Sequence, residues 1–391
     1  MKRKPLRVVC VAGARPNFIK VSPILRALHE AGAFPVLVHT GQHYDAQMSQ
    51  VFFDDLDLPA PDFKLNVGSG SHALQTARVM ERFEPVLEEV RPDWVVVVGD
   101  VNSTMACGLV TAKLRPALGC RLAHVEAGLR SHDWRMPEEV NRAVTDRVAD
   151  LLLTSSRDAH LNLEREGLEE RARFVGNVMI DTLLRQLPKA RALDTPGRLD
   201  LKRDSYVLST VHRPSNVDEP AALAIILSAL SRIAREMPVV LPIHPRTRKN
   251  AITFGLGTLL ASLKTIEPLG YREMLSLSDG ARVVLTDSGG VQEETTVLGV
   301  PCVTLREQTE RPATITHGTN RLARWPLTVD GVLESWRHAS TEGRRGVGER
   351  VPEGWDGHAA SRVVAMLKAV GTGDATGRFA HLGDVEPGEI L

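Results

Sequence analysis

The chain has 391 residues, of which 43% are apolar and 25% are charged, a globular composition with enough length for two hydrophobic cores. Its 48 basic residues balance its 48 acidic residues, so it lacks the overall basic field that nucleic-acid or anionic-membrane binding needs. A local basic cluster that binds a small anion is compatible with this balance. We therefore expect neither nucleic acid nor a membrane as a partner.

The cysteines are typical of a reducing compartment, so we expect a cytoplasmic protein. Cys10, Cys107, Cys120 and Cys302 lie far apart, without the paired spacing of zinc sites or disulfide frameworks. The basic start and the apolar run at Val8–Val11 resemble a signal peptide only faintly, and we interpret the run as a buried strand. No apolar stretch approaches the ~20 residues of a membrane span, so we expect a soluble protein.

In the first half of the chain, short apolar runs alternate with longer amphipathic stretches. The short runs predict strands at Val8–Val11, Pro35–His39, Trp94–Val98, Arg121–His124 and Leu151–Thr154. The longer stretches predict helices at Pro23–Ala31, Leu74–Val90, Thr104–Leu114 and Pro137–Val148. Strands joined by helical crossovers indicate a parallel sheet covered on both faces.

The same alternation restarts after a polar connector at Leu187–Lys202. It predicts strands at Tyr206–Ser209, Val239–Ile243, Lys264–Ile266, Val283–Leu285 and Cys302–Leu305, and helices at Pro220–Glu236, Tyr271–Leu277 and Val291–Leu298. We therefore predict an α/β fold with two Rossmann-like, doubly wound domains that face a cleft. The predicted parts are an N-terminal domain at 1–186, a C-terminal domain at 203–358, a helix at 359–370 and a tail at 371–391.

Open α/β sheets bind ligands at the carboxyl ends of their strands, so the residues after each strand are site candidates. After the first strand, a turn at Gly13 precedes Arg15 and Lys20, with Pro23 opening the next predicted helix. Free backbone N–H groups and two cations suit a diphosphate, although both side chains could equally be surface cations.

Three carboxylates follow the middle strands of the first half. Asp100 is either a site carboxylate or a helix cap, Glu126 follows the next strand, and Glu138 begins a helix, where acids are common.

His124 and Glu126 share one face of an extended segment, an arrangement that could suggest a metal site. No third ligand accompanies them, so we expect no metal.

The second half has its strongest signal at Ser288-Gly289-Gly290, between a strand and a helix. Bare amides and a helix dipole attract an anion there, and Glu294, one turn later, could reach a pair of ribose hydroxyls. Arg311 would lie at the rim of the same cleft.

Two histidines also follow strands in this half. His212, with Arg213, suits a phosphate. His244 is a weaker candidate, because it could simply fix a turn.

Taken in order, these segments closely resemble the UDP-N-acetylglucosamine 2-epimerases of the non-hydrolysing type, over roughly residues 6–370. The resemblance rests on G-x-R-P-x-x-x-K, T-G-Q-H, G-D, H-V-E-A-G-L-R, P-E-E-x-N-R, H-R, D-S-G-G-x-Q-E-E and T-E-R-P. It implies two domains of the glycosyltransferase-B and glycogen phosphorylase type, with the last helix packing back on the first domain. It also implies a homodimer that epimerises carbon 2 of a UDP-N-acetylhexosamine, interconverting UDP-GlcNAc and UDP-ManNAc for polysaccharide biosynthesis.

The resemblance also implies roles for the candidate residues. The second domain would hold UDP, with Ser288, Gly289 and Gly290 at the diphosphate, Glu294 at the ribose, and Arg311, His212, Arg213 and Arg15 around the charge. The family's acids and bases map onto Asp100, Glu126 and Glu138, with Lys20 and His212 beside them.

Two features depart from the family pattern. Asn17 stands where many members carry Glu, so one potential acid is missing from the first loop. The variant segments Ala14–Phe18 and Gly99–Thr104 suggest a divergent branch with a sugar other than plain N-acetylglucosamine. Gln42 and His244 are candidates for a second, activating nucleotide-sugar site, but Val67–His72 lacks the arginine that accompanies such sites in activated bacterial members. Allosteric activation is therefore not expected.

The reaction itself constrains the chemistry. The hydrogen at carbon 2 is barely acidic and has no neighbouring carbonyl, so UDP must leave first or concurrently, giving a 2-acetamidoglucal that adds UDP again. This route needs no cofactor. Three alternatives stay open: a hydrolysing epimerase that releases N-acetylmannosamine and UDP, a glycosyltransferase of the same fold, and a nucleotide-sugar sensor.

Overall fold

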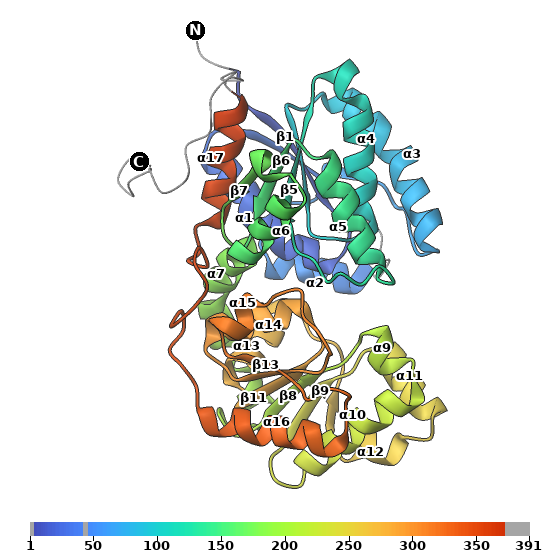
Figure 1. Ribbon diagram of the computed structural model, residues 1–391, viewed down its shortest axis with the longest axis vertical. Coiled ribbons are helices and arrows are strands. Elements are labelled where there is room, and N and C mark those ends of the chain that lie inside the picture. The colour runs from blue at the N-terminus through green and yellow to red at the C-terminus, as the bar shows by residue number, and fades with distance from the viewer. Residues whose placement is uncertain (1–3, 42–45, 372–391) are drawn as a thin grey trace. The chain divides into compact units, whose positions relative to one another are not determined.

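A computed structural model describes residues 4–41 and 46–371 of the chain (Figure 1). The described residues form two compact units: unit 1 comprises residues 4–41, 60–178 and 358–371, and unit 2 comprises residues 46–59 and 179–357. Each unit has its own parallel sheet with intervening helices, which confirms the predicted α/β class with two doubly wound domains. The predicted domain boundaries and the cleft stay predictions.

Unit 1 contains a seven-stranded parallel sheet in the order β3-β2-β1-β4-β5-β6-β7. Its strands are β1 (Arg7–Ala12), β2 (Phe34–His39), β3 (Phe63–Lys64), β4 (Trp94–Val98), β5 (Arg121–Ala127), β6 (Leu151–Thr154) and β7 (Ala172–Phe174). Every residue of β4 and β6 is buried, as expected for strands covered on both faces.

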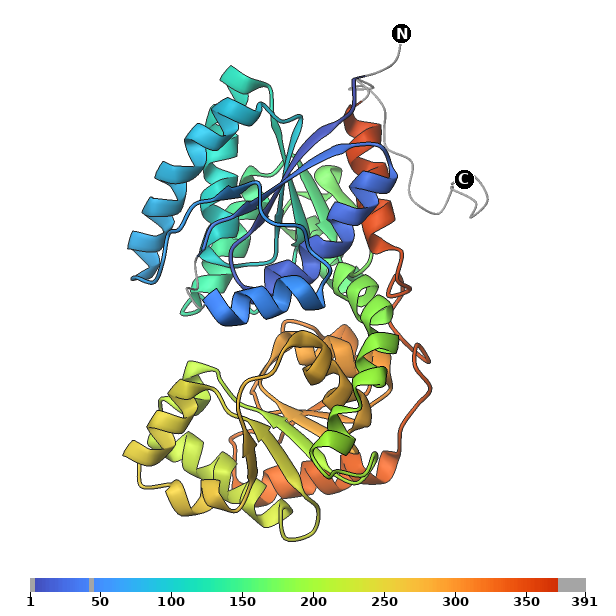
Figure 2. The same ribbon diagram turned by 180° about the vertical axis from the view of Figure 1, so that it is seen from behind.

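The helices of unit 1 cover both faces of this sheet (Figures 1 and 2). They are α1 (Arg15–Glu30), α3 (His72–Val90), α4 (Asn102–Leu118), α5 (Pro137–Val148), α6 (Arg157–Arg165), the 3₁₀ helix η1 (Glu169–Arg171) and α17 (Ala359–Gly371). Helix α1 packs against α17, whereas α3, α4 and α5 pack side by side in a row. The indole N–H of Trp94 donates to the carbonyl of Leu367 over 3.1 Å, which connects α17 to the start of β4.

Unit 2 contains a six-stranded parallel sheet in the order β10-β9-β8-β11-β12-β13. Its strands are β8 (Val207–Thr210), β9 (Val239–Pro242), β10 (Lys264–Ile266), β11 (Val283–Thr286), β12 (Cys302–Thr304) and β13 (Asn320–Leu322). The remaining helices are α2 (Ala46–Asp55), α7 (Val178–Leu193), α8 (Thr195–Arg198), α9 (Pro214–Val217), α10 (Pro220–Ile233), α11 (Pro245–Thr253), α12 (Gly257–Ala261), α13 (Tyr271–Gly280), α14 (Gly289–Leu298), α15 (Ala313–Thr316) and α16 (Val329–Glu342). In the part of the chain that the structure describes, no helix is long and apolar enough to cross a membrane.

Two local predictions were wrong. Helix α1 begins at Arg15 rather than at Pro23, because Pro16 occupies its first turn, where a missing N–H costs no hydrogen bond. The connector predicted at Leu187–Lys202 is mostly helical, since α7 continues through Pro188 to Leu193 and α8 follows. The buried apolar side chains of α7 outweigh its internal proline.

The segment at residues 46–59 joins unit 2 through ion pairs that sequence periodicity cannot show. Arg272 donates to Asp57 over 3.0 Å, and Lys189 donates to the same carboxylate over 2.7 Å. Both cations come from helices that lie more than 130 residues away in the sequence.

The strand order reverses at one place in each sheet. In unit 1 the reversal lies between β1 and β4, and in unit 2 it lies between β8 and β11. The loops after two such neighbouring strands lead to helices on opposite faces and leave a crevice at the carboxyl ends, the usual ligand site of open α/β sheets. The fold therefore directs attention to the loops after these four strands.

The docking of α17 is testable through Leu367, whose side chain is fully buried. We expect Leu367→Ala to lower the free energy of unfolding by about 2–5 kcal/mol, because it removes apolar burial and leaves a cavity. Urea denaturation followed by tryptophan fluorescence measures this change. Ser361→Ala, at an exposed position of the same helix, is the control and should change stability by less than ~0.5 kcal/mol. Equal effects of the two substitutions would contradict the docking.

Candidate functional site

The first loop of unit 1 is organised by a single amide side chain. The backbone N–H groups of Gly13 and Ala14 both donate to Oδ1 of Asn17 over 3.0 Å. The side-chain amide of Asn17 in turn donates to the carbonyl of Val98 at the end of β4, over 3.0 Å. The prediction of free amides at Gly13 was therefore wrong, because Asn17 accepts from them. Arg15 lies half-buried at the start of α1.

Lys20 of α1 and Glu126, near the end of β5, form a buried ion pair. Their Nζ and Oε2 atoms are 2.5 Å apart, and each side chain is at most 5% exposed. Gly99 lies directly beside this pair, because a Cβ atom at that position would stand 2.9 Å from Nζ of Lys20. The close approach and the positive φ of 66° both require glycine there.

A β-bulge directs Glu126 away from the face predicted for it. The β5–β6 pairing shifts register between Val125 and Ala127, and Glu126 has a φ of +70°. Bulges re-aim side chains, and here Glu126 reaches Lys20 of α1, whereas His124 contacts Asp146 of α5. The prediction that His124 and Glu126 share a face was therefore wrong.

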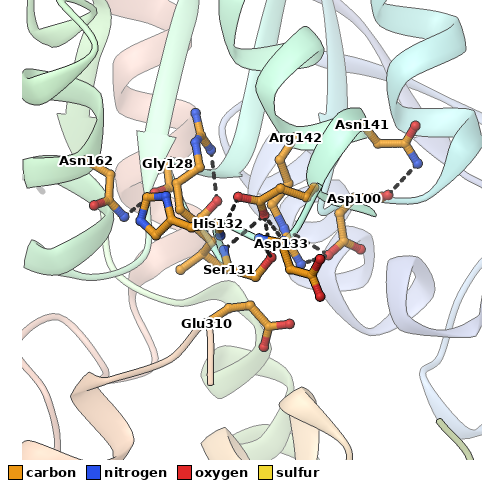
Figure 3. Close-up of polar contacts among 12 residues, drawn as sticks. Asp100, Gly128, Ser131, His132, Asp133, Asn141, Arg142, Asn162 and Glu310 are labelled. Atoms are coloured by element: carbon orange, nitrogen blue, oxygen red, sulfur yellow. Dashed lines mark hydrogen bonds and ion pairs between the residues drawn. The ribbon is translucent and has the colours of Figure 1, made fainter. Parts of the chain in front are cut away.

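Asp100 is held by the first turns of α5 (Figure 3). Arg142 donates to Oδ2 of Asp100 from Nε over 3.1 Å and from Nη2 over 2.6 Å. The side chain of Asn141 donates to the backbone carbonyl of Asp100 over 2.8 Å. The carboxylate stays 22% exposed, so it is oriented and still reachable from solvent. The helix-cap interpretation was wrong, since Val101 is the N-cap of α4.

The neighbouring acids of α5 have different environments. Glu139 is buried, accepts from Arg142 over 2.7 Å, and accepts from the backbone N–H groups of Ser131 and His132 over 2.9 Å. Burial alone would raise the pKa of Glu139, but these hydrogen bonds and the Arg142 charge hold it below its usual value. Glu138 is half-buried, and its carboxylate has no hydrogen bond or ion pair to another residue within 4–41 and 46–371.

The site of unit 2 is built around a buried aspartate at the end of β11. Asp287 accepts from the backbone N–H groups of His212 and Arg213 over 3.0 and 2.9 Å, and from the Asn216 side chain over 3.1 Å. Nδ1 of His212 lies 3.0 Å from its other oxygen. Burial would raise the pKa of Asp287, but these donors and the His212 charge hold it below its usual value. The ring of His212 itself stays half-exposed.

Helix α14 begins with an anion-binding geometry. Ser288 is its N-cap residue, and Gly289 and Gly290 form its first turn, so their N–H groups have no acceptor within the helix. A Cβ atom at Gly289 would stand 2.5 Å from Nη1 of Arg311, so only glycine lets this guanidinium lie against the helix start. Backbone amides, a helix dipole and a cation converge at this point, which suits a phosphate group.

Further cations at this end of unit 2 share two buried carboxylates. Arg306 donates twice to Glu310, over 2.7 and 2.9 Å, and Arg213 also reaches Glu310 over 3.4 Å. Nε of Arg311 lies 3.1 Å from Glu293. Burial would raise the pKa of Glu310, but the three arginines keep it far below its usual value. Glu310 and Glu293 thus hold Arg306, Arg213 and Arg311 in fixed positions.

Glu294 is buried one turn into α14, beside the hydroxyl of Tyr271. Burial, followed by the nearby charge of Glu293, raises the pKa of Glu294 to about 7, and the Tyr271 hydroxyl opposes this shift. A carboxylate in this environment gains from new hydrogen-bond donors such as hydroxyl groups.

The last two candidates from the sequence are His244 and Gln42. His244 is the N-cap of α11 and accepts from the backbone N–H of Arg246 over 3.2 Å, so its visible role is to fix the turn. Gln42 lies outside the described residues. Within those residues, no group of three or more His, Cys, Asp or Glu side chains could hold a metal ion.

The structure also reveals supporting residues to which the sequence analysis assigned no such role. They are Asn17 in the first loop, Glu139 and Arg142 in α5, and Asp287 and Asn216 in unit 2. All five lie within or next to the motifs quoted above, so their place in the sequence was a usable signal. Their roles depend on long-range contacts that only the fold supplies.

Comparisons with known proteins extend over both units. The chain matches the family model described as UDP-N-acetylglucosamine 2-epimerase at residues 26–368. It is 43% identical over 329 residues to a UDP-N-acetylglucosamine 2-epimerase of Methanocaldococcus jannaschii, covering 81% of this chain and 88% of that protein. It is 42% identical over 337 residues to a UDP-2,3-diacetamido-2,3-dideoxy-D-glucuronate 2-epimerase of Pseudomonas aeruginosa, covering 85% and 92%. The crystal structure of the M. jannaschii enzyme in complex with UDP-GlcNAc and UDP gives a TM-score of 0.84 at 38% identity, covering 93% and 100%.

The lowered pKa of Asp287 makes the stability of unit 2 depend on pH. An unfolded Asp has a pKa of about 3.9, so the contribution of Asp287 is complete above about pH 4 and is lost as pH falls through its lower folded pKa. We expect Asp287→Asn to cost about 3–5 kcal/mol at pH 7, and this cost to shrink toward pH 2. Urea unfolding across this pH range measures the difference from the unsubstituted protein.

Asp330→Asn is the control for this comparison, because the Asp330 side chain is 87% exposed in its pair with Arg232. Its effect should stay within ~0.5 kcal/mol at every pH. If the cost of Asp287→Asn did not change with pH, the contribution of Asp287 to the free energy of unfolding would come from the shape of its side chain and not from its charge.

Proposed function

The chain belongs to the UDP-N-acetylglucosamine 2-epimerase family, and we propose that it inverts carbon 2 of a UDP-linked 2-acetamido sugar without net hydrolysis. One observation carries this proposal. In unit 1, Asp100 and Glu126 end adjacent strands of the sheet, and each is held by its own cation, Arg142 and Lys20. Two oriented carboxylates at one sheet edge suit the removal and return of a proton on two sides of a sugar ring.

The reaction that we propose begins with loss of UDP. The bond between carbon 1 and the diphosphate oxygen breaks, and its electron pair leaves with UDP. A carboxylate takes the proton from carbon 2, and the C–H electron pair forms the double bond of a 2-acetamidoglucal. The reverse steps, with a proton delivered from the opposite face, restore the UDP linkage with inverted carbon 2. No redox change occurs, so the chemistry calls for no nicotinamide.

Unit 2 supplies the groups that would stabilise the departing diphosphate. The first-turn amides at Gly289 and Gly290, with Arg311 against them, would receive the phosphate oxygens. His212 and Arg213, anchored by Asp287, would add positive charge as the leaving group becomes more anionic. Glu294 would accept hydrogen bonds from the ribose hydroxyls.

Unit 1 supplies the acid and base groups. We propose Asp100 as one member of the pair and either Glu126 or Glu138 as the other. Lys20 belongs to the same site through its ion pair with Glu126, and Arg15 would add charge near the substrate. We propose further that the protein is a cytoplasmic homodimer that acts in polysaccharide biosynthesis.

The relatives carry names for two different sugars at almost equal identity, 43% for the N-acetylglucosamine enzyme and 42% for the diacetamido-glucuronate enzyme. Overall identity therefore does not choose between these substrates. The two sugars share UDP, a 2-acetamido group and an epimerised carbon 2, which defines the substrate class proposed here. UDP-N-acetylglucosamine is the first compound to test, and the diacetamido uronic acid is the second.

Proton NMR in deuterium oxide tests the proposed reaction directly. With UDP-N-acetylglucosamine and without added metal or nicotinamide, we expect a UDP-linked manno isomer that carries deuterium at carbon 2. Free N-acetylmannosamine with UDP would contradict the non-hydrolysing outcome. Transfer of the sugar to an acceptor without exchange at carbon 2 would identify a glycosyltransferase, and binding without any turnover of either sugar would favour a sensor.

Substitutions in the two units should separate catalysis from UDP binding. We expect Asp100→Asn to lower kcat by about 10²–10⁴-fold while UDP affinity changes little, because a proton-transfer group is lost. Arg311→Ala should weaken UDP binding by about 10–100-fold, the loss of a charge-assisted contact. Steady-state kinetics and calorimetric titration with UDP measure the two effects. Equal loss of both properties in both variants would indicate that these residues merely maintain the fold.

A further inference from the structure

His124 is a fully buried residue of β5 that bridges two elements of unit 1. Its Nε2 atom lies 2.8 Å from the backbone carbonyl of Gly99, in the loop after β4. Its Nδ1 atom lies 2.6 Å from Oδ1 of Asp146 in α5. The residue thus connects the end of β4 with a helix on one face of the sheet.

Both partners of His124 can only accept hydrogen bonds. A backbone carbonyl has no proton to give. Asp146 is a carboxylate, since its other oxygen pairs with Arg130 over 2.8 Å and accepts from the backbone N–H of Gly128 over 3.1 Å. Each ring nitrogen must therefore carry a hydrogen for both contacts to form. The geometry fits an imidazolium whose charge Asp146 balances directly, with Arg130 and Glu166 forming a second pair behind it.

Asp146 extends the contact to the segment that carries Glu126. Its Oδ2 atom accepts from the backbone N–H of Gly128 over 3.1 Å and lies 2.8 Å from Arg130. The carbonyl of Gly128 accepts from Asn162 over 3.0 Å (Figure 3). The peptide groups on both sides of Gly128 are therefore fixed within two residues of Glu126.

The backbone of both anchored segments enters the left-handed region, which glycine adopts readily and Glu126 adopts only at a cost. Gly99, Glu126 and Gly128 have φ values of 66°, 70° and 80°, all in the left-handed region. A non-glycine residue held there costs about 1–3 kcal/mol and persists only when its surroundings enforce it. The His124–Asp146 pair contacts the backbone next to Asp100 on one side and close to Glu126 on the other.

We propose that His124, held as an imidazolium by Asp146, is a positioning residue that sets Asp100 and Glu126 in place for proton transfer. This inference rests on the proposed function, because those two carboxylates are its acid and base candidates. Loss of the bridge lets the loop after β4 and the bulge of β5 relax independently. A displacement of about 1 Å between catalytic groups and substrate can cost ~10²-fold in rate.

His124→Gln tests the proposal, because one amide nitrogen cannot reproduce donors on two sides of a ring. We expect kcat to fall by about 10²-fold, while KM and the affinity for UDP change by less than ~3-fold, since unit 2 would hold the nucleotide. The matched control is Asp150→Asn. Asp150 also supports β5 from a neighbouring loop, accepting from the backbone N–H of Leu122 over 2.8 Å, but it does so at the opposite end of the strand. Asp150→Asn should lower the free energy of unfolding and leave kcat within ~2-fold of the unsubstituted protein.

A spectroscopic measurement tests the charge state without relying on activity. In protein labelled with ¹⁵N-histidine, the signals that disappear in His124→Gln should show a hydrogen on both ring nitrogens at the pH of the assay. A single N–H, or His124→Gln with unchanged kcat, would overturn the proposal. An unsubstituted protein that epimerises no UDP-sugar would instead contradict the proposed function, while the ring signals would still report whether the imidazolium exists.

Discussion

The carboxylates near the carboxyl ends of β4 and β5 in unit 1 are mostly buried. A buried charge is stable only beside a partner of opposite charge. Glu126 has Lys20, Asp100 and Glu139 share Arg142, and Asp146 lies between His124 and Arg130. Several of these pairs join different elements, since Lys20 of α1 pairs with Glu126 of β5 and Arg142 of α5 pairs with Asp100 in the loop after β4. The ion pairs therefore fix the relative positions of α1, α5 and the ends of β4 and β5. The same contacts that stabilise the fold also orient the carboxylates that we propose as acid and base.

In unit 2 the buried charges also need partners, but here buried acids hold cations in place. Its buried acids, Asp287, Glu293 and Glu310, lie behind cations and donors that surround the start of α14. The acids preorganise these groups, so little side-chain ordering is left for the moment when an anion binds. A site that already holds its cations in place stabilises charge that develops on a leaving group without further reorganisation. The two units thus offer different chemistry, with oriented carboxylates in unit 1 and cations around the start of α14 in unit 2.

Sequence periodicity predicted most strands and several helices, and the rule that sites follow strands singled out Asp100, Glu126, His212 and Ser288 as candidates. The roles of these residues were less predictable. Asn17 looked like a missing acid, yet it accepts from the amides that were expected to be free. The bulge that turns Glu126 away from His124 cannot be recognised from the apolar pattern of β5, which is only seven residues long. Segment 46–59 joins unit 2 through partners over 100 residues away, which local patterns cannot report.

The left-handed backbone at Glu126 has a cost in stability that contacts from other elements offset. A β-branched or bulky residue would resist that conformation, and even Glu adopts it at a cost in stability. The strain is local, whereas the interactions that offset it come from α1 through Lys20 and from α5 through Asp146. A residue that relaxes the backbone here would also release the carboxylate from Lys20. Under the function proposed above, stability and activity are therefore opposed at Glu126.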